Sequence, residues 1–227
     1  KIIKKNLKRN YNKVILFSNQ NFANVIAYLF TLNLKDKIKL IAFERNHINE
    51  LDYFFNLKDK FKKKILKLLM KFTYHKFDAI ITNSKEASKD LTKYLRVKVY
   101  TIYNPIKLKK ITIKKNKKNN FLNILNIGRL EKQKDHITLI KAVEIVSKKI
   151  NVKLKIVGSG SEYLFLQNYI QNAGIQKFIK IIKQTRNVKK FYLNSNLFVL
   201  TSLYEGFPNV LVESIMYNIP IISSNCK

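Results

Sequence analysis

The stretch EGFPNVLVE at residues 205–213 decides how the second half of this chain folds. A run typical of a strand precedes it at residues 196–202 (NLFVLTS), and apolar residues at helical spacing follow the proline. Proline is tolerated at the first position of a helix, so Pro208 marks a helix start and we expect a helix over 208–216. A strand, a short loop and a helix are therefore predicted here, as in the repeating unit of an α/β fold.

Two glutamates flank the predicted turn, Glu205 in the loop and Glu213 on the helix. Both can face a ligand at the helix N-terminus, where free backbone N–H groups and the helix dipole favour anions. A phosphorylated ligand that also has hydroxyl groups fits this arrangement, and a nucleotide-sugar has both parts. The alternative is a pair of surface glutamates that only complement the helix dipole.

Further short motifs occur in a set order along the chain. They are TNS at 82–84, IYNP at 102–105, NIGRL at 126–130 followed by Lys134, IVGSG at 156–160 and NIPII at 218–222. Together with residues 205–213, this ordered set resembles the retaining glycosyltransferases of the GT-B fold that have a paired-glutamate motif (glycosyl transferases group 1 and family 4). One motif alone would be a weak signal, whereas the ordered set is a strong one.

The resemblance implies a role for each matching position in the glutamate segment. Glu213 is expected to bind the ribose hydroxyls of the nucleotide. Glu205 is expected to lie near the donor sugar, where it binds hydroxyls or stabilises positive charge at the anomeric carbon. The backbone N–H groups of Gly206, Phe207 and Asn209 are expected to line the sugar–phosphate pocket.

The resemblance also implies two cations beside the leaving diphosphate. Arg129 and Lys134 match the pair that stabilises the negative charge developing there, so with Glu205 they are the expected catalytic residues. Arginine is rare in this chain and Arg129 follows a glycine at a strand end. In so basic a chain, Lys134 taken alone is also explained as surface charge.

The remaining candidates are less specific. Gly158 and Gly160 form a short turn that is expected to let the backbone pass close to the nucleotide, although a full GxGxxG pattern is lacking. Residues 183–188 are expected to touch the base. His47 is either a polar loop residue or a contact to the acceptor or donor sugar. No His/Cys/Asp cluster has metal-ligand spacing, so no metal is expected, and no cofactor either, since the nucleotide-sugar is a substrate.

The second half of the chain alternates predicted strands with predicted helices, which is typical of a doubly wound parallel sheet. Ligands in such sheets bind beyond the carboxyl ends of the strands. Asp135 is the predicted N-cap of one helix, and its apolar face is expected to hold Ile137, Ile140, Val143 and Ile145. The expected strands are 122–127, 152–157, 178–182, 197–200 and 220–223, and the expected helices are 135–149, 162–172, 188–193 and 208–216.

The first half is predicted to be a second α/β region. We expect strands at 13–17, 38–43, 78–82 and 97–102 and helices at 22–32, 58–72 and 85–94. The predicted fold class is α/β, with two Rossmann-like doubly wound parallel-sheet domains (GT-B), both incomplete. Residues 1–106 are assigned to the acceptor-side domain, 107–120 to a linker and 121–227 to the nucleotide-sugar-binding domain. The chain begins with lysine and stops just after a strand, so a fragment is expected.

Composition narrows the class of protein. Hydrophobic residues make up 46% of the 227, so a packed core is expected and disorder is not. The formal net charge is +31, and five of the 45 basic residues are arginine. Because specific nucleic-acid recognition favours arginine, the lysine excess indicates solvated surface charge, or attraction to an anionic membrane or to diphosphate ligands.

The cysteine content and the hydropathy of the sequence indicate the cellular compartment in which the protein works. Cys226 is the only cysteine, so no disulfide can form within the chain and a cytosolic setting is expected, with the inner face of the membrane as a work site. No stretch of 18 or more uncharged apolar residues occurs in the sequence.

The sequence therefore predicts a retaining glycosyltransferase. It would move a sugar from a nucleotide-sugar, with a UDP-sugar as the expected donor, to a hydroxyl of a glycan or lipid-linked acceptor in polysaccharide or oligosaccharide biosynthesis. Two alternatives stay open: a different enzyme on the same fold, such as a sugar-phosphate synthase, and a basic non-catalytic module that binds membrane or nucleic acid.

Overall fold

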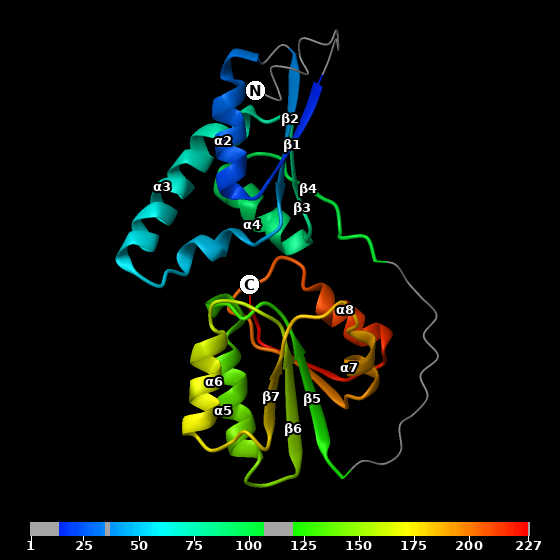
Figure 1. The fold of residues 1–227 in the computed structure, drawn as a ribbon. Coiled ribbons are helices and arrows are strands. Elements are labelled where there is room, and N and C mark those ends of the chain that lie inside the picture. Colours follow the sequence, from blue (N-terminus) through cyan, green and yellow to red (C-terminus); the bar gives the residue numbers. More distant parts are fainter. Residues whose placement is uncertain (1–13, 35–36, 107–119, 227) are drawn as a thin grey trace. The chain divides into compact units, whose positions relative to one another are not determined.

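The computed structural model describes residues 14–34, 37–106 and 120–226, which fold as two α/β units (Figure 1). The first unit holds the chain up to Pro105 and the three residues Glu205–Phe207, and the second holds Ile106–Tyr204 and Pro208–Cys226. Each unit has its own sheet, and all strand pairs in both sheets are parallel. The predicted class of two Rossmann-like parallel-sheet domains is thus confirmed. The predicted linker lies almost wholly outside the described residues.

The sheet of the first unit has the order β1-β2-β3-β4. Its strands are β1 (Val14–Asn19), β2 (Ile38–Glu44), β3 (Ala79–Thr82) and β4 (Tyr100–Thr101). Its helices are α2 (Asn21–Thr31), α3 (Leu57–Thr73) and α4 (Lys85–Leu95), and its 3-10 turns are η1 (Leu32–Leu34), η2 (Ile48–Asp52) and η3 (Tyr74–Lys76). The strand predicted over 97–102 is shorter than expected, because only two of its residues pair with β3.

One apolar cluster joins these elements. Val25 of α2, Ala42 of β2, Met70 of α3, Ile80 of β3 and Leu91 of α4 are all buried in it. Each of the three helices therefore turns its apolar face toward the same core, as expected for amphipathic helices on a parallel sheet.

The sheet of the second unit has the order β7-β6-β5-β8-β9. Its strands are β5 (Leu122–Ile127), β6 (Val152–Val157), β7 (Ile179–Ile182), β8 (Leu197–Leu200) and β9 (Ile221–Ser223). The helices are α5 (His136–Val146), α6 (Tyr163–Asn172), α7 (Lys189–Leu193) and α8 (Asn209–Met216), with the 3-10 turn η4 (Lys132–Lys134) after β5.

Helices cover both faces of this second sheet, α5 and α6 on one side and α7 and α8 on the other (Figure 1). Successive residues of β5 alternate between the two cores, since Ile124 packs with α5 and α6 whereas Leu125 packs with Phe191 of α7. A strand buried on both faces reads as a nearly continuous apolar run, as in 197–200 (LFVL). The strand 152–157 (VKLKIV) instead alternates apolar residues with lysines, which is also a strand signal.

Helix α5 tests two sequence predictions, its N-cap and its buried face. The predicted N-cap is confirmed, because the Asp135 carboxylate accepts hydrogen bonds from the Thr138 amide at 3.4 Å and from the Thr138 hydroxyl at 2.8 Å. The predicted burial of Ile145 is wrong, since its side chain is 61% exposed. The buried stripe of α5 is instead made of His136, Leu139, Ile140 and Val143, which follow the i, i+3, i+4, i+7 spacing.

A buried carboxylate lies at the end of β2 in the first unit. Glu44 is 4% exposed and accepts hydrogen bonds from the Asn24 amide at 2.7 Å and from the Tyr74 hydroxyl. Burial raises the pKa of Glu44 from 4.5 to about 7; the nearby negative charge of Glu50 adds to this effect, and the two hydrogen bonds oppose it. Burial likewise raises the pKa of Glu50, although the Asn46 and Asn21 amides donate to it at 2.5 Å each.

Glu44 is expected to make the first unit less stable as the pH rises. A carboxyl whose pKa is raised on folding gives its full stabilisation below pH 4.5 and loses it as the pH passes about 7. The difference between these pKa values corresponds to about 3 kcal/mol. Urea unfolding of the wild type and Glu44→Gln at pH 5 and pH 8 checks this: the wild type should lose stability relative to the variant. Equal differences at the two pH values would contradict it.

Candidate active site

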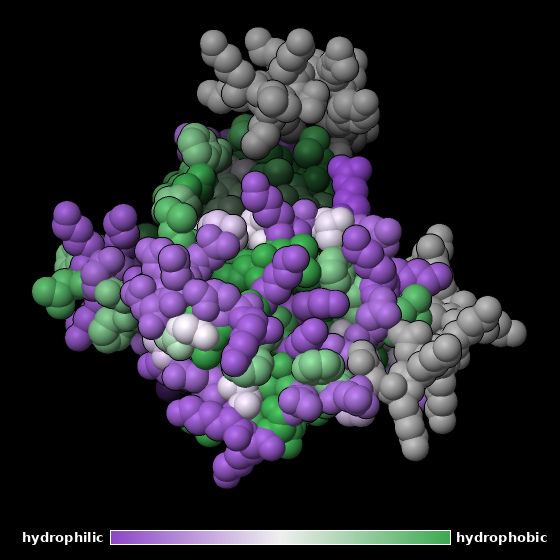
Figure 2. All heavy atoms as spheres, turned by 60° about the horizontal axis from the view of Figure 1, so that its bottom comes forward, coloured by the Kyte–Doolittle hydropathy of each residue, from purple (hydrophilic) through white to green (hydrophobic). Residues whose placement is uncertain are grey.

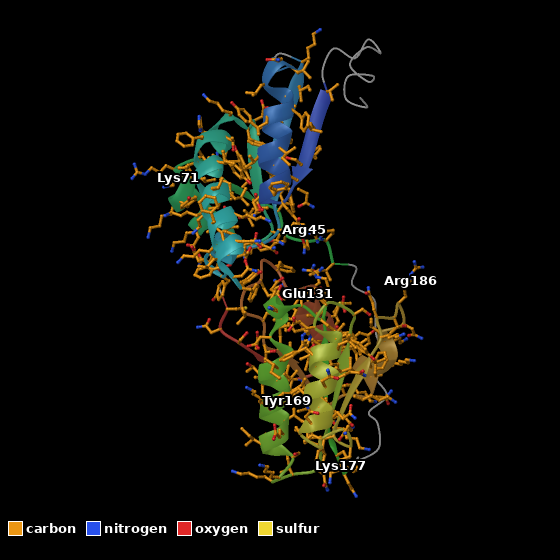
Figure 3. The ribbon with its side chains drawn as sticks, turned by 60° about the vertical axis from the view of Figure 1, so that its left-hand side comes forward. Arg45, Lys71, Glu131, Tyr169, Lys177 and Arg186 are labelled. Carbon is orange, nitrogen blue, oxygen red and sulfur yellow. The ribbon has the colours of Figure 1, made fainter. Side chains whose placement is uncertain are left out.

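The carboxyl ends of the second unit's strands form one edge of its sheet. Figure 3 shows Glu131, in the loop after β5, at this edge, and Lys177, which precedes β7, at the opposite end of the unit. From β5 the chain proceeds outward through β6 to β7 and then returns to the other side of β5 with β8. The strand order therefore reverses between β5 and β8, and such a switch point is where open parallel sheets bind ligands.

At this switch point the two central strands separate. Strands β5 and β8 pair over Ile124 with Leu197 and Leu125 with Phe198. The next residue of β5, Asn126, is 1% exposed and its side-chain amide donates to the Val199 carbonyl at 2.8 Å. A side-chain amide thus binds the β8 backbone where the regular pairing ends.

The loop after β5 is tied to the loop after β8. The Gln133 amide donates to the Tyr204 carbonyl at 2.8 Å, and the Leu203 N–H donates to the Gln133 carbonyl at 2.8 Å. The Thr201 hydroxyl lies 3.0 Å from the Lys134 carbonyl and 2.9 Å from the Asp135 carbonyl. These contacts hold the loop after β5, which contains Arg129 and Lys134, beside the end of β8. The chain continues from there to Glu205 and Glu213.

Both predicted cations lie in this loop. Arg129 is exposed, and its guanidinium donates to the Gln133 side-chain oxygen at 3.4 Å. Lys134 is half-buried in η4, and its aliphatic carbons would lie 3.7–3.8 Å from a Cβ built on Gly128. The lysine stem therefore packs over the end of β5, and Gln133 connects Arg129 to the loop after β8.

Gly158 and Gly160 lie where the loop after β6 packs against the loop after β5. A Cβ on Gly158 would lie 1.8 Å from the Gly128 carbonyl oxygen, and a Cβ on Gly160 would lie 2.4 Å from the Leu130 carbonyl oxygen. The loops after β5 and β6 pack backbone to backbone, with the Leu130 N–H donating to the Ser159 carbonyl at 3.0 Å. The close approach that requires glycine here is therefore between two protein loops, and a contact to nucleotide remains a prediction.

Glu213 is the fifth residue of α8 and is half-buried. The buried Tyr192 hydroxyl donates to one of its carboxylate oxygens at 2.7 Å. Burial, together with the adjacent carboxylate, raises the pKa of Tyr192, so the phenol keeps its proton and stays the donor. The Tyr192 ring stacks on Tyr217, with centroids 4.8 Å apart, which fixes the side chain that orients Glu213.

The other predicted donor-binding residues lie in the loop between β8 and α8. Glu205, Gly206 and Phe207 connect Tyr204 to Pro208, which precedes the first residue of α8, Asn209. The helix therefore begins one residue later than predicted. The first amides of α8 have no side-chain cap from Pro208, so its N-terminus is suited to an anion.

His136, at the start of α5, follows the predicted cation Lys134 by two residues. It is 2% exposed, and neither ring nitrogen has a hydrogen-bond partner among the described residues. Burial lowers the pKa of His136 to about 4, and the charge of Lys134 adds to this while Asp135 opposes it. The ring is therefore neutral at pH 7, next to the predicted phosphate-binding lysine.

His47 lies in the first unit and is 3% exposed. Its Nδ1 accepts from the Asn49 N–H at 3.3 Å as the N-cap of η2, and its Nε2 lies 3.0 Å from an Asp90 carboxylate oxygen. Both ring nitrogens thus have partners inside this unit, so Nε2 holds the proton that Asp90 accepts. The contact to a sugar remains a prediction.

Two family models together match almost the whole chain. The model described as Glycosyl transferases group 1 matches residues 108–227, and the model described as Glycosyltransferase Family 4 matches residues 2–110. The boundary between the two matches falls close to that between the two structural units.

Individual relatives agree with these matches. The chain is 31% identical to the uncharacterized glycosyltransferase MJ1059 of Methanocaldococcus jannaschii, over all of this chain and 60% of the relative. It is 30% identical to the Campylobacter jejuni N-acetylgalactosamine-N,N'-diacetylbacillosaminyl-diphospho-undecaprenol 4-alpha-N-acetylgalactosaminyltransferase, over 75% of this chain and 48% of the relative. The chain therefore spans about half to three-fifths of the length of these two relatives.

A solved structure shows the same fold. HepE of Anabaena, in complex with UDP-glucose, matches 99% of this chain and 63% of its own with a TM-score of 0.73 and 15% identity.

The loop packing predicts a sharp difference between two glycines. Gly158→Ala should destabilise the second unit by about 1–3 kcal/mol or more, because the new methyl group overlaps the Gly128 carbonyl. Gly128→Ala is the matched control, since its methyl group would make only ordinary contacts with the Lys134 side chain. Urea unfolding of both variants checks this. Equal losses of unfolding free energy would show that overlap with the Gly128 carbonyl is not why a glycine is needed at position 158.

Proposed function

Since this chain belongs to the glycosyl transferases group 1 family, we propose that it is the core of a retaining glycosyltransferase that moves a sugar from a nucleotide-sugar to a hydroxyl of an acceptor. One observation supports this most: the loop of Arg129 and Lys134 is bound to the loop that leads to Glu205 and Glu213, at the switch point of the second sheet. The loop of the two predicted cations therefore lies beside the end of β8, at the place where such sheets bind ligands.

The proposed donor is a UDP-sugar, in line with the UDP-glucose in the HepE complex. Glu213 would accept hydrogen bonds from the ribose hydroxyls, held in place by Tyr192. The amides at the start of α8, with those of Gly206 and Phe207, would face the sugar and phosphates. Glu205 would lie beside the donor sugar. The nucleotide-sugar is a substrate in this scheme, and no cofactor is proposed.

The proposed chemistry is a front-side displacement. The bond between the anomeric carbon and the leaving phosphate oxygen breaks, the acceptor oxygen bonds to the same face of that carbon, and the acceptor proton passes to the leaving phosphate. Arg129 and Lys134 would stabilise the negative charge that grows on the diphosphate, so the protein contributes mainly positioning and electrostatics. Glu205 would stabilise positive charge at the anomeric carbon.

The proposed acceptor is a glycan or a lipid-linked sugar at the inner, anionic face of a membrane. The Campylobacter jejuni relative is named for an undecaprenol-linked acceptor, which supports this class of substrate. The formal net charge of +31 favours an anionic surface or a diphosphate-linked substrate.

Removing Glu213 should weaken nucleotide binding. Glu213→Ala is expected to raise the dissociation constant for UDP by about 10- to 150-fold, because hydrogen bonds to a charged acceptor contribute about 1.5–3 kcal/mol. Isothermal titration with UDP measures this. Glu144→Ala is the control, since Glu144 also accepts from a tyrosine hydroxyl, that of Tyr169 at 3.2 Å, but lies on α5. Unchanged UDP affinity in Glu213→Ala would refute the ribose assignment.

Removing Arg129 should slow turnover more than it weakens donor binding. The charge partner of Arg129 grows in the transition state, so Arg129→Ala is expected to lower kcat by about 100-fold or more, with a smaller change in KM for the donor. Steady-state kinetics with a UDP-sugar check this. Lys177→Ala removes a cation at the opposite end of the same unit and is the control (Figure 3). A change confined to KM would count against the proposed role.

A further inference from the structure

Helix α3 of the first unit has an apolar stripe on its exposed side. Leu57, Phe61, Ile65, Leu68 and Phe72 follow one another at intervals of four, four, three and four residues, which places them on one face of a helix. Their side chains are 82%, 67%, 42%, 54% and 64% exposed. We call these five residues the outer stripe of α3.

The outer stripe is not part of the unit's own core. Met70 and Thr73, on the opposite side of α3, are buried in the first unit, and Leu66 packs partly against the same cluster. At 100° per residue, these three positions lie across the helix from Leu68 and Phe61. The helix therefore has two apolar faces, and the core of its own unit uses one of them.

Lysines border the outer stripe on both sides. On a helical projection, Lys60, Lys64 and Lys71 lie along one border, and Lys58 and Lys62 lie along the other. Space-filling spheres at the left of the molecule, where α3 lies, show hydrophobic groups between hydrophilic ones (Figure 2). The one acidic residue of α3, Asp59, lies 3.2 Å from the Lys63 ammonium.

The basic surface continues from α3 onto α4. Lys67 and Lys71 of α3, with Lys93 and Arg96 of the α4 end, surround a hollow of about 690 Å³ between the two helices. The carboxylate of Asp90, which also lines this hollow, lies 3.0 Å from His47. Positive charge thus predominates beside the outer stripe as well as along it.

We propose that the outer stripe of α3 is a membrane-docking face that lies in the surface of an anionic bilayer. A bilayer supplies hydrocarbon for the five apolar side chains and lipid phosphates for the two rows of lysines. A second copy of this chain would bring a surface of the same charge against it, in a molecule of net charge +31. This inference rests on the proposed function for its purpose, since a lipid-linked acceptor would be reached from that surface.

The helix is suited to lie on the bilayer rather than to cross it. Seven lysines occur within its 17 residues, and charged side chains are costly in the hydrocarbon core. Within the described part of the chain, no helix is both long and apolar enough to span a membrane. A lysine-rich helix with one wide apolar face is typical of interfacial binding.

Vesicle cosedimentation tests the proposal. The probes are vesicles of phosphatidylcholine alone and vesicles with about one-third phosphatidylglycerol, a composition that makes the surface anionic. The wild type should bind the anionic vesicles at least about tenfold more tightly than the neutral ones. The triple variant Phe61→Ser, Leu68→Ser, Phe72→Ser should lose at least about tenfold in affinity for the anionic vesicles, because its apolar contacts are removed.

Helix α2 supplies the matched control. Phe22, Leu29 and Phe30 are 65%, 51% and 76% exposed, and α2 has no lysine among its residues Asn21–Thr31. The triple variant Phe22→Ser, Leu29→Ser, Phe30→Ser should therefore keep wild-type vesicle binding. A second variant, Lys62→Glu with Lys64→Glu, should lose binding to anionic vesicles while keeping its apolar residues.

Several outcomes would overturn the proposal. These are equal binding to neutral and anionic vesicles, full binding by the α3 serine variant or the glutamate variant, and equal loss in the α2 control. A wild-type dimer in sedimentation velocity that the α3 variant abolishes would show that a second copy covers the stripe instead. UDP titration without vesicles separates this proposal from the proposed function. If the protein binds UDP but no vesicles, only the membrane-docking proposal is refuted.

Discussion

The separation of β5 and β8 beyond their shared residues is the constraint on which the candidate site depends. Where two parallel strands diverge, backbone groups lose their regular partners, and buried polar groups must find others. Asn126, Gln133 and Thr201 supply them with side-chain groups that reach across the gap. The same hydrogen bonds fix the loop of Arg129 and Lys134, so the end of the β5–β8 pairing and the position of the two predicted cations have one origin.

Local signals in the sequence determined much of the fold and part of the site. The strand 152–157 was predicted with its observed bounds, because its alternation of apolar residues with lysines can be read from the chain alone. The burial of Ile145 and the length of β4 were predicted wrongly, since both depend on what packs or pairs nearby. Motif order indicated Arg129 and Glu213. Tyr192, which holds Glu213, lies 21 residues earlier in the chain, and no local pattern connects the two.

The stability of the two units is expected to change with pH in opposite directions. In the first, Glu44 is buried with a raised pKa, so folding favours its protonated form. In the second, His136 is buried with a pKa of about 4, so folding favours its neutral form, and that contribution is lost as the pH falls from 6.5 through 4. Acid therefore weakens the second unit through its histidine, whereas a rise toward pH 7 weakens the first through its carboxylate.

The glycine contacts between the loops after β5 and β6 restrict where this site can change in evolution or in the laboratory. Gly158 and Gly160 leave no room for a side chain, and each faces the backbone of the neighbouring loop, so neither loop can vary alone. The loop after β7 is different: residues 183–188 are mostly exposed, and Gln184 contacts the Ser159 hydroxyl through its own N–H at 3.2 Å. A library of variants is therefore best confined to 183–188, where diversity does not compete with the backbone packing between the loops after β5 and β6.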